Sequence, residues 1–466
     1  MLVTFATLGL LALFLGVLVF GVLLLRRTGW ARLLGIVLVV EALLALTAQI
    51  ALSTLPFGIG EPLIRVGFRE IALQALATIG IALAVGTALV ALVRWSQHTT
   101  LRGARRATVV TAALLLVPVV GALGLYGLAQ ASLPERERER DPAKREITLN
   151  PGFAWSVYAQ GTIDNPTVIT FGPDGKLYIG DISGTLWVAS DDNGDKQIDR
   201  MTPWATGFQL LVGLVWRDGE LYTASAGKVE AWRDADGDGK ADTHRTVVEN
   251  LPSMILQPHS NNSLAFGPDG RLYFGVGSTT SGDYEPNKLA ASVLSVKPDG
   301  SDLKVFAHGF GNTFGVAFNS AGDLFGGDNS PGAGNENPDE FNHIVEGGNY
   351  GYPYVFGDPE KKLGTIGALA TFPAHATPTG MSFYSGTTFP ASYRDNGFVA
   401  LWQRGEIVRV ELAKTSSGDY LSRMSTFGAG FLYPIDAISG PDGDLYVADF
   451  GTSAIYRISY VGGEAK

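Results

Sequence analysis

SLAFGPDGRLYFGVG, residues 263–277, has alternating apolar residues on both sides of Gly-Pro-Asp-Gly. The alternation predicts two half-buried β-strands. Pro-Asp-Gly supplies a fixed φ followed by a positive φ, as a tight turn between antiparallel strands requires. The stretch therefore predicts a β-hairpin. Five further stretches have the same pattern: TVITFGPDGKLYIGD (167–181), GLVWRDGELYTAS (213–225), GVAFNSAGDLFGGD (315–328), GMSFYSGTTFPASYRDNGFVALW (380–402) and DAISGPDGDLYVADF (436–450).

The six hairpins start about 46 to 65 residues apart, which is the repeat range of β-propellers. A second pair of strands follows most hairpins, such as KVEAWRD with TVVENLP and EIVRVEL with LSRMSTF. Four strands in each of six units predict an all-β, six-bladed β-propeller over residues 150–462. The last unit is short of its fourth strand, and AWSVYAQG (154–161) is expected to supply that strand and close the ring.

The first part of the chain has a different composition, dominated by Leu, Ala, Val and Gly. Four apolar stretches, near 3–25, 30–52, 71–93 and 107–130, are each long enough to cross a bilayer as a helix. They predict an α-helical membrane domain of four transmembrane helices over residues 1–130. The charged residues 131–149 are expected to form a solvated linker to the propeller.

The arginines of this region predict its orientation in the membrane. The loops after the first and third stretches hold three and four arginines, and the loop after the second holds two. The positive-inside rule then places the first and third loops in the cytoplasm. We expect a multi-pass protein of the plasma (inner) membrane, with both termini and the propeller on the periplasmic or extracellular side. Glu41, within the second stretch, is either a functional residue or one that forms a hydrogen bond between helices.

Charge and cysteine content exclude several classes of function. Residues 147–466 carry 21 basic and 37 acidic residues. This acidic balance argues against a nucleic-acid partner, whose phosphates need Lys or Arg. The chain has no cysteine, so disulfides, thiolate metal sites and cysteine nucleophiles are excluded.

Two acidic loops are candidate Ca²⁺ sites, because alternate carboxylates and a glycine at the sixth position are typical of calcium loops. In DADGDGKAD (234–242), Asp234, Asp236, Asp238 and Asp242 stand at offsets 1, 3, 5 and 9. In DDNGDKQID (191–199), the candidate ligands are Asp191, Asn193, Asp195 and Asp199, with Lys196 in place of the glycine. A solvated hairpin turn is the alternative for both loops, and a structural role is expected in either case.

Three longer stretches connect the chain to a known family. HSNNSLAFGPDGRLYFGVGS (259–278), GFGNTFGVAFNSAGDLFGGDNSPGAGNENPDEFNHIVEGGNYGYP (309–353) and HATPTGMSFYSGTTFPASYR (375–394) resemble the soluble glucose dehydrogenase and sorbosone dehydrogenase family. The resemblance covers most of residues 150–460. It implies a six-bladed propeller that oxidises a sugar or alcohol with pyrroloquinoline quinone and Ca²⁺.

The resemblance also implies a set of site residues. His259 would take the proton of the substrate hydroxyl, which suits an imidazole that titrates near neutral pH. The calcium that accompanies the cofactor would be held at Ser330 and Pro331. The implied cofactor contacts are Asn312, Phe372, Gln403 and Arg404. Electrons would pass from the cofactor to a membrane quinone or a partner cytochrome.

Other functions remain open because the family pattern is incomplete. Arginine stands in the family at the position of Gly311, and a basic residue at that of Gln403, whereas cationic contacts suit a tricarboxylated quinone. A second hypothesis is therefore a non-catalytic propeller that binds a ligand or partner as a subunit of a membrane complex. A third is a metal-dependent sugar-lactone hydrolase, to which Asp328, Asp339 and Glu340 could contribute carboxylates.

Overall fold

A computed structural model describes residues 140–253, 260–280, 282–330, 337–357 and 364–462. The chain divides into two compact units, of which the second begins at Arg140. The four predicted membrane stretches, Glu41, His259 and Pro331 lie outside the described residues. Within those residues, no helix has the length and apolar character needed to cross a membrane.

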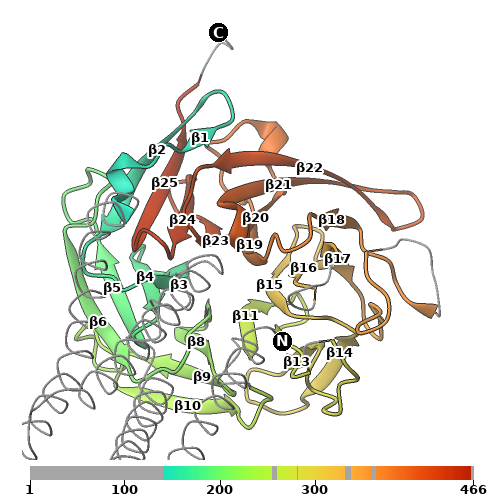
Figure 1. The fold of residues 1–466 in the computed structure, drawn as a ribbon. Coiled ribbons are helices and arrows are strands. Elements are labelled where there is room, and N and C mark those ends of the chain that lie inside the picture. The colour runs from blue at the N-terminus through green and yellow to red at the C-terminus, as the bar shows by residue number, and fades with distance from the viewer. Residues whose placement is uncertain (1–139, 254–259, 281, 331–336, 358–363, 463–466) are drawn as a thin grey trace, which may run out of the picture. The chain divides into compact units, whose positions relative to one another are not determined.

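The described residues form an all-β, six-bladed propeller, as the repeated hairpins predicted (Figure 1). Each blade is an antiparallel sheet, numbered here in chain order from its innermost strand. Blade one is β3 (Pro166–Phe171), β4 (Leu177–Asp181), β5 (Thr185–Ser190) and β6 (Arg200–Thr206). Blade two is β7 (Gly213–Arg217), β8 (Glu220–Ser225), β9 (Lys228–Arg233) and β10 (Thr243–Val248). Blade three is β11 (Asn261–Phe266), β12 (Leu272–Val276), β13 (Ser292–Val296) and β14 (Lys304–His308).

The second half of the ring repeats this order. Blade four is β15 (Thr313–Phe318), β16 (Leu324–Asp328), β17 (Asp339–Ile344) and β18 (Ala370–Phe372). Blade five is β19 (Pro378–Phe383), β20 (Gly397–Leu401), β21 (Glu406–Lys414) and β22 (Tyr420–Ala429), with the short 3-10 helices η3 (Ala391–Tyr393) and η4 (Trp402–Arg404) in its connections. Blade six is β23 (Pro434–Ser439), β24 (Leu445–Asp449), β25 (Ala454–Tyr460) and β2 (Phe153–Gln160).

Blade six confirms the predicted ring closure. Its outermost strand, β2, comes from the start of the propeller and pairs antiparallel with β25, from Phe153 opposite Tyr460 to Gln160 opposite Ala454. The preceding residues are also part of the domain, although the sequence suggested a linker there. They form η1 (Pro142–Lys144) and β1 (Thr148–Leu149), and β1 adds a fifth strand to blade five beside β22.

The core lies between neighbouring blades and follows from the repeated hairpin. The leucine after each turn is the first or second residue of the second strand. It is almost fully buried in blades one, two, three, four and six: Leu177, Leu221, Leu272, Leu324 and Leu445. An aromatic residue follows each of them, and these rings pack edge-on against aromatic rings of an adjacent blade, as Tyr446 does against Phe171. Burial of these side chains is the main force that holds the blades together.

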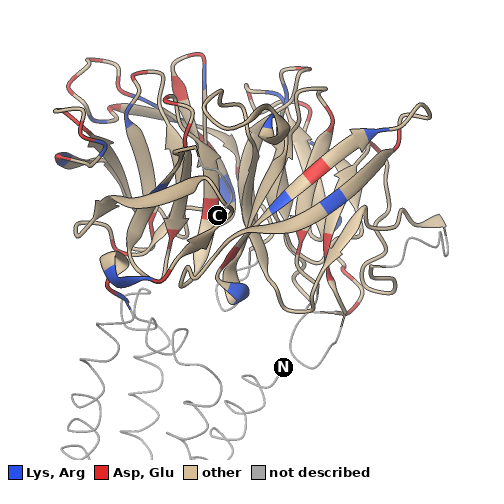
Figure 2. Cartoon of the chain, turned by 90° about the horizontal axis from the view of Figure 1, so that it is seen from above, with Lys and Arg blue, Asp and Glu red and all other residues tan. Residues whose placement is uncertain are grey.

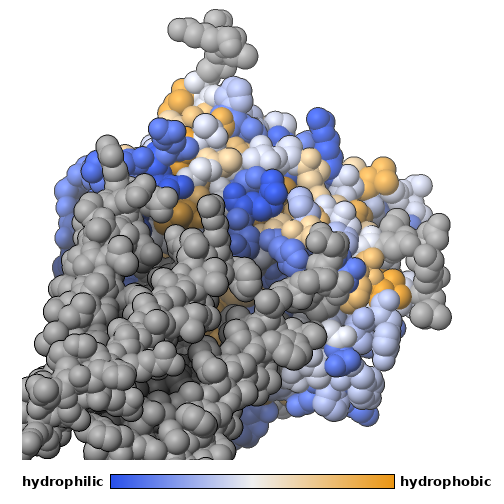
Figure 3. All heavy atoms as spheres, in the orientation of Figure 1, coloured by the Kyte–Doolittle hydropathy of each residue, from blue (hydrophilic) through white to orange (hydrophobic). Residues whose placement is uncertain are grey.

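The strand order determines which loops meet at each end of the propeller. Successive strands are antiparallel, so the loops that lead into the innermost strands lie at the same end as the loops between second and third strands. We call this the lead-in end. The hairpin turns and the two acidic loops lie at the opposite end. Figure 2 shows that charged residues occur mainly in loops and turns. Hydrophilic and hydrophobic residues are mixed on the part of the propeller face that is visible in Figure 3.

Candidate functional site

The side-chain amides of Asn262 and Asn312 lie in contact at the lead-in end of blades three and four. Asn262, in β11, donates a hydrogen bond of 2.8 Å to Asn312 Oδ1 and another of 3.0 Å to the Thr313 carbonyl. All three residues are buried. Buried amides are retained where they find hydrogen-bond partners, and the Asn262 side-chain N–H group finds two acceptors here. The contact joins the strand that follows His259 to the cofactor contact implied at Asn312.

Asp328, at the end of β16, fixes the backbone on which Asn312 sits. Its carboxylate accepts hydrogen bonds of 2.9 Å from the Gly311 and Asn312 amides. Burial raises the pKa of Asp328 well above its usual range, and the nearby Glu340 raises it further. Asp449 caps the lead-in loop of blade six in the same way, accepting from the Leu432 and Tyr433 amides. The repetition indicates that Asp328 supports the loop.

Asn329 and Asp339 extend the network from blade four to blade five. Asn329 donates from its backbone to the Asn312 carbonyl (3.1 Å) and from its side chain to the Pro378 carbonyl (3.0 Å). Asp339 accepts from the backbone amides of Ser330 (2.9 Å) and Thr377 (2.7 Å). Burial raises the pKa of this carboxyl. Ser330, an implied calcium ligand, is therefore held close to Asn312.

Gln403 and Arg404 lie on η4, which is tied to the same region. The Trp402 amide donates to the Thr377 carbonyl (3.0 Å), and the Gln403 amide donates to the Ala376 carbonyl (3.3 Å). Both predicted side chains are exposed. Arg404 forms an ion pair of 2.9 Å with Glu406. The structure thus brings Asn312, Ser330, Gln403 and Arg404 to one end of the propeller.

Phe372 is the predicted cofactor contact that the structure places elsewhere. It ends β18 and is 3% exposed. It packs in a hydrophobic cluster with Phe341, Ala376 and Met381. Its ring belongs to the core between blades four and five, because strand β18 directs it away from solvent.

Gly311 shows why the arginine of the family pattern is absent. A Cβ on this residue would lie 2.2 Å from the Asn329 carbonyl oxygen, which is closer than real Cβ atoms approach backbone. Any side chain would displace Asn329 from its hydrogen bond with Asn312. The close approach of these two loops therefore leaves no space for an arginine at this position.

The three carboxylates of the lactone-hydrolase hypothesis accept hydrogen bonds from different partners and do not converge on one point. Asp328 and Asp339 accept backbone amides of different loops, and Glu340 accepts from the Gly357 amide (2.5 Å) and the Asn342 side chain (3.0 Å). Among the described residues, the group of carboxylates with a geometry suited to a metal ion does not include them. The geometry of the described carboxylates gives this hypothesis no support.

That metal-suited group is the second acidic loop, where one oxygen each of Asp234, Asp236 and Asp242 lie within 4.8 Å of one another. Asp238 is not part of the group. Asp234 also accepts the Gly237 (2.7 Å) and Gly239 (2.9 Å) amides, so the loop is folded around its carboxylates. The loop lies at the end of the propeller opposite Asn312, which agrees with a structural role.

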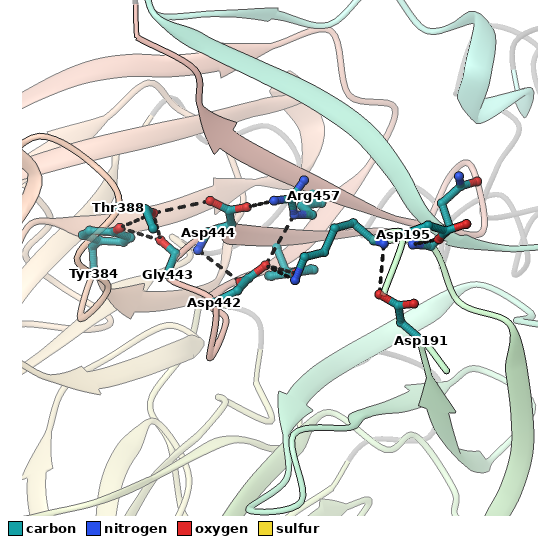
Figure 4. A network of polar contacts seen from close by, with 11 residues as sticks. Asp191, Asp195, Tyr384, Thr388, Asp442, Gly443, Asp444 and Arg457 are labelled. Atoms are coloured by element: carbon teal, nitrogen blue, oxygen red, sulfur yellow. Dashed lines mark hydrogen bonds and ion pairs between the residues drawn. The ribbon is translucent and has the colours of Figure 1, made fainter. Parts of the chain in front are cut away.

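The first acidic loop has the same fold despite its lysine. Asp191 accepts the Gly194 (2.7 Å) and Lys196 (2.9 Å) amides, and Lys196 adopts the left-handed φ of 69° that Gly239 provides in the other loop. Asp199 accepts the amides of Asp192 and Asn193, while Asp195 accepts that of Gln197. The Lys196 ammonium lies 3.4 Å from Asp442 of blade six, which also contacts Arg457 (Figure 4). The lysine therefore joins the loop to the neighbouring blade.

The comparison with protein families concerns the propeller. The family model described as "Domain of unknown function (DUF7133)" matches residues 139–461. The chain is a DUF7133 protein. A relative of this DUF7133 chain in Borreliella burgdorferi, described as "Uncharacterized protein", is 27% identical over 361 residues, which cover 68% of this chain and 93% of the relative.

Solved structures establish that the DUF7133 propeller has the fold of soluble sugar dehydrogenases. The holo pyranose dehydrogenase PQQ domain of Coprinopsis cinerea is 16% identical, with a TM-score of 0.58, and covers 68% of this chain and 98% of its own. The PQQ-bound aldose sugar dehydrogenase of Streptomyces coelicolor is 19% identical, with a TM-score of 0.53, covering 68% and 99%. The calcium structure of the Trichoderma reesei family AA12 enzyme is 17% identical, with a TM-score of 0.58, covering 69% and 98%. At these identities, the similarity shows the fold alone.

Proposed function

We propose that the propeller takes a sugar or alcohol at its lead-in end, outside the cytoplasm. The supporting observation is the run of hydrogen bonds from Asn262 through Asn312 and Asn329 to Pro378. It unites three segments that the family resemblance singles out. Rigid loops of this kind suit a small hydroxylated ligand, since they hold the polar groups around them in fixed positions.

The finer proposal is a quinoprotein-like oxidoreductase. His259 would act as general base towards the substrate hydroxyl, and pyrroloquinoline quinone would accept the hydride when bound. The described residues do not fit this tricarboxylated cofactor in its usual cradle. Gly311 leaves no room for a cation, and Arg404 is paired with Glu406. The usual cationic contacts of the quinone are therefore missing from the described residues.

The run of hydrogen bonds from Asn262 to Pro378 also supports a second candidate function. This candidate is a non-catalytic propeller that binds its ligand as a subunit of a membrane complex. Both candidates bind a sugar or alcohol, but only the oxidoreductase would oxidise it. The purified full chain should be incubated with pyrroloquinoline quinone and Ca²⁺ and assayed for dye reduction with D-glucose and glycerol. Turnover that His259→Ala abolishes supports the oxidoreductase. Sugar binding without turnover supports the second candidate.

Calcium is proposed at the second acidic loop, where three carboxylates converge. Calcium prefers six to eight oxygen ligands, so carbonyl groups or water would complete the coordination. Arg245, at the twelfth position of this loop, pairs with Glu220 at 2.7 Å and supplies no carboxylate. We expect the ion to fix the loop, far from the ligand.

The membrane anchor is proposed from the four apolar stretches within residues 1–130. A membrane quinone or a cytochrome would then be the electron acceptor of the oxidoreductase. Protease added to sealed right-side-out vesicles should cut between the last stretch and the propeller, in residues 131–139. Protection of that segment would contradict the orientation proposed here.

A further inference from the structure

The loop that leads into blade five, residues 373–377, contains two non-glycine residues in the left-handed region. His375 has a φ of 59° and Thr377 a φ of 58°. Few non-glycine residues adopt this region, and for a β-branched residue it is a clear outlier. Strained backbone that is retained in a folded protein directs attention to function.

Thr377 has an architectural explanation. Asn165, at the corresponding place in blade one, has a φ of 53°, and each of the two residues precedes a proline that begins an innermost strand, Pro166 or Pro378. Ile163, which corresponds to His375, is buried and is not left-handed. The conformation of His375 is therefore not shared by the corresponding residue of blade one.

The surroundings hold His375 in this conformation. The next residue, Ala376, is fully buried, its amide donates to the Pro373 carbonyl (3.1 Å), and its carbonyl accepts the Gln403 amide (3.3 Å). Thr377 is fixed by Asp339 (2.7 Å). Between these anchors the His375 side chain is exposed. The loop thus presents an imidazole to solvent on a backbone that is held by hydrogen bonds next to it.

His375 also belongs to the lead-in end where the candidate site lies. Asp339 accepts hydrogen bonds both from Thr377 of this loop and from Ser330. The Ala376 carbonyl of the loop accepts the amide of Gln403, in η4. Asp339 accepts the Thr377 amide two residues further along the chain, which keeps His375 on the part of the loop nearest to this carboxylate. An imidazole offers one donor and one acceptor, which is the pair that a hydroxyl group needs.

We propose that His375 hydrogen-bonds a hydroxyl group of the sugar or alcohol at the lead-in end. This inference rests on the proposed function and adds a residue that determines which ligand fits. The fixed loop reduces the ordering cost of binding, since the side chain is already presented. The role of His375 in ligand recognition would then explain why the strained backbone of this loop is retained.

The test is His375→Gly in the full chain, because glycine accepts a positive φ and removes the imidazole. We expect the unfolding temperature to rise by a few degrees, because the strain is relieved. We expect the affinity for D-glucose or glycerol to fall about tenfold, which is the effect of one lost hydrogen bond. Asp218→Gly is the matched control, since Asp218 is exposed, has a φ of 51° and lies in a turn at the opposite end. It should raise stability without weakening binding.

A second measurement follows the histidine ring signals by NMR. The signal missing from the His375→Gly spectrum should shift when D-glucose is added to the wild-type chain. Binding by His375→Gly equal to that of wild type, with an unshifted signal, would overturn the inference and leave the proposed function standing. A wild-type chain that binds neither D-glucose nor glycerol would overturn both.

Discussion

Asn262 donates its side-chain hydrogen bond to Asn312 across 2.8 Å, although 49 residues separate the two in the chain. The contact joins the innermost strand of blade three to the loop that leads into blade four. We expect Asn262→Ala to lower the free energy of unfolding by about 2–3 kcal/mol, because two buried acceptors lose their donor.

Denaturant unfolding of the full chain, followed by tryptophan fluorescence, would measure this loss. The control is Asn287→Ala, since Asn287 is exposed and only caps the Leu289 amide. It should cost under about 1 kcal/mol. If the two variants lost the same free energy of unfolding, the buried Asn262–Asn312 contact would contribute no more to stability than an exposed cap.

Gly311 should not tolerate a side chain. Gly311→Ala would bring a Cβ to 2.2 Å from the Asn329 carbonyl, so the loop must shift. We expect a loss of about 1–3 kcal/mol in unfolding free energy, which is the usual cost of overpacking. Gly397→Ala, whose Cβ would have its nearest neighbour at 3.5 Å, is the control and should be nearly neutral. Gly311→Arg should fail to create quinone binding, and a gain of cofactor affinity in that variant would contradict our account of the loop.

Asp436 should make stability depend on pH. Burial between β23 and β3 raises its pKa to about 7, despite hydrogen bonds from the Ile169 and Ala437 amides. The unfolded chain titrates near 3.8, so the folded state binds the proton more tightly. The stabilisation is complete below about pH 4 and is lost as the pH rises through about 7, with a total on the order of 4 kcal/mol.

Asp436→Asn removes this titration. We predict that the stability of wild type relative to Asp436→Asn falls between pH 4 and pH 7, as measured by calorimetric unfolding at several pH values. The other buried carboxyls titrate in both proteins, so the difference isolates Asp436. A difference that stays constant over this range would show that Asp436 keeps an ordinary pKa.

Calcium should stabilise the propeller through the second acidic loop. At a concentration of about one hundred times Kd, binding adds about 2.7 kcal/mol to the unfolding free energy. Asp242→Asn keeps an oxygen to accept the Ala235 and Asp236 amides and removes the charge, so the calcium-dependent rise in Tm should disappear. Asp199→Asn, the equivalent change in the first loop, should leave most of that rise, and the reverse pattern would assign the ion to the first loop.

The six blades could be predicted from the sequence because the turn residues and the alternating apolar residues of each hairpin are local in the chain. Each hairpin carries its own turn and its own alternating strands, and AWSVYAQG was left over to close the ring. The strand β1 was not predicted, since Thr148 and Leu149 acquire their strand character only from pairing with β22. Two residues in a charged stretch carry no periodic signal of their own.

The candidate site could be predicted only in part, because its geometry depends on loops that meet in space. The motifs named Asn312, Ser330, Gln403 and Arg404, which lie at one end of the propeller, and their contact with a cofactor or metal stays a prediction. They could not show that Phe372 is core, which depends on packing against Phe341 and Met381. Asn262, Asn329 and His375 were missed. The Asn261–Asn262 pair before an apolar strand was a usable signal, since an innermost strand buries its polar residues only with partners.

The most direct test of the central claim is calorimetric titration of the full chain with D-glucose and with glycerol. The account predicts saturable binding that is lost in Asn312→Ala, at the lead-in end, and retained in Asp242→Asn, at the opposite end. Absence of saturable binding by the wild-type chain, or binding that survives Asn312→Ala and disappears in Asp242→Asn, would contradict it.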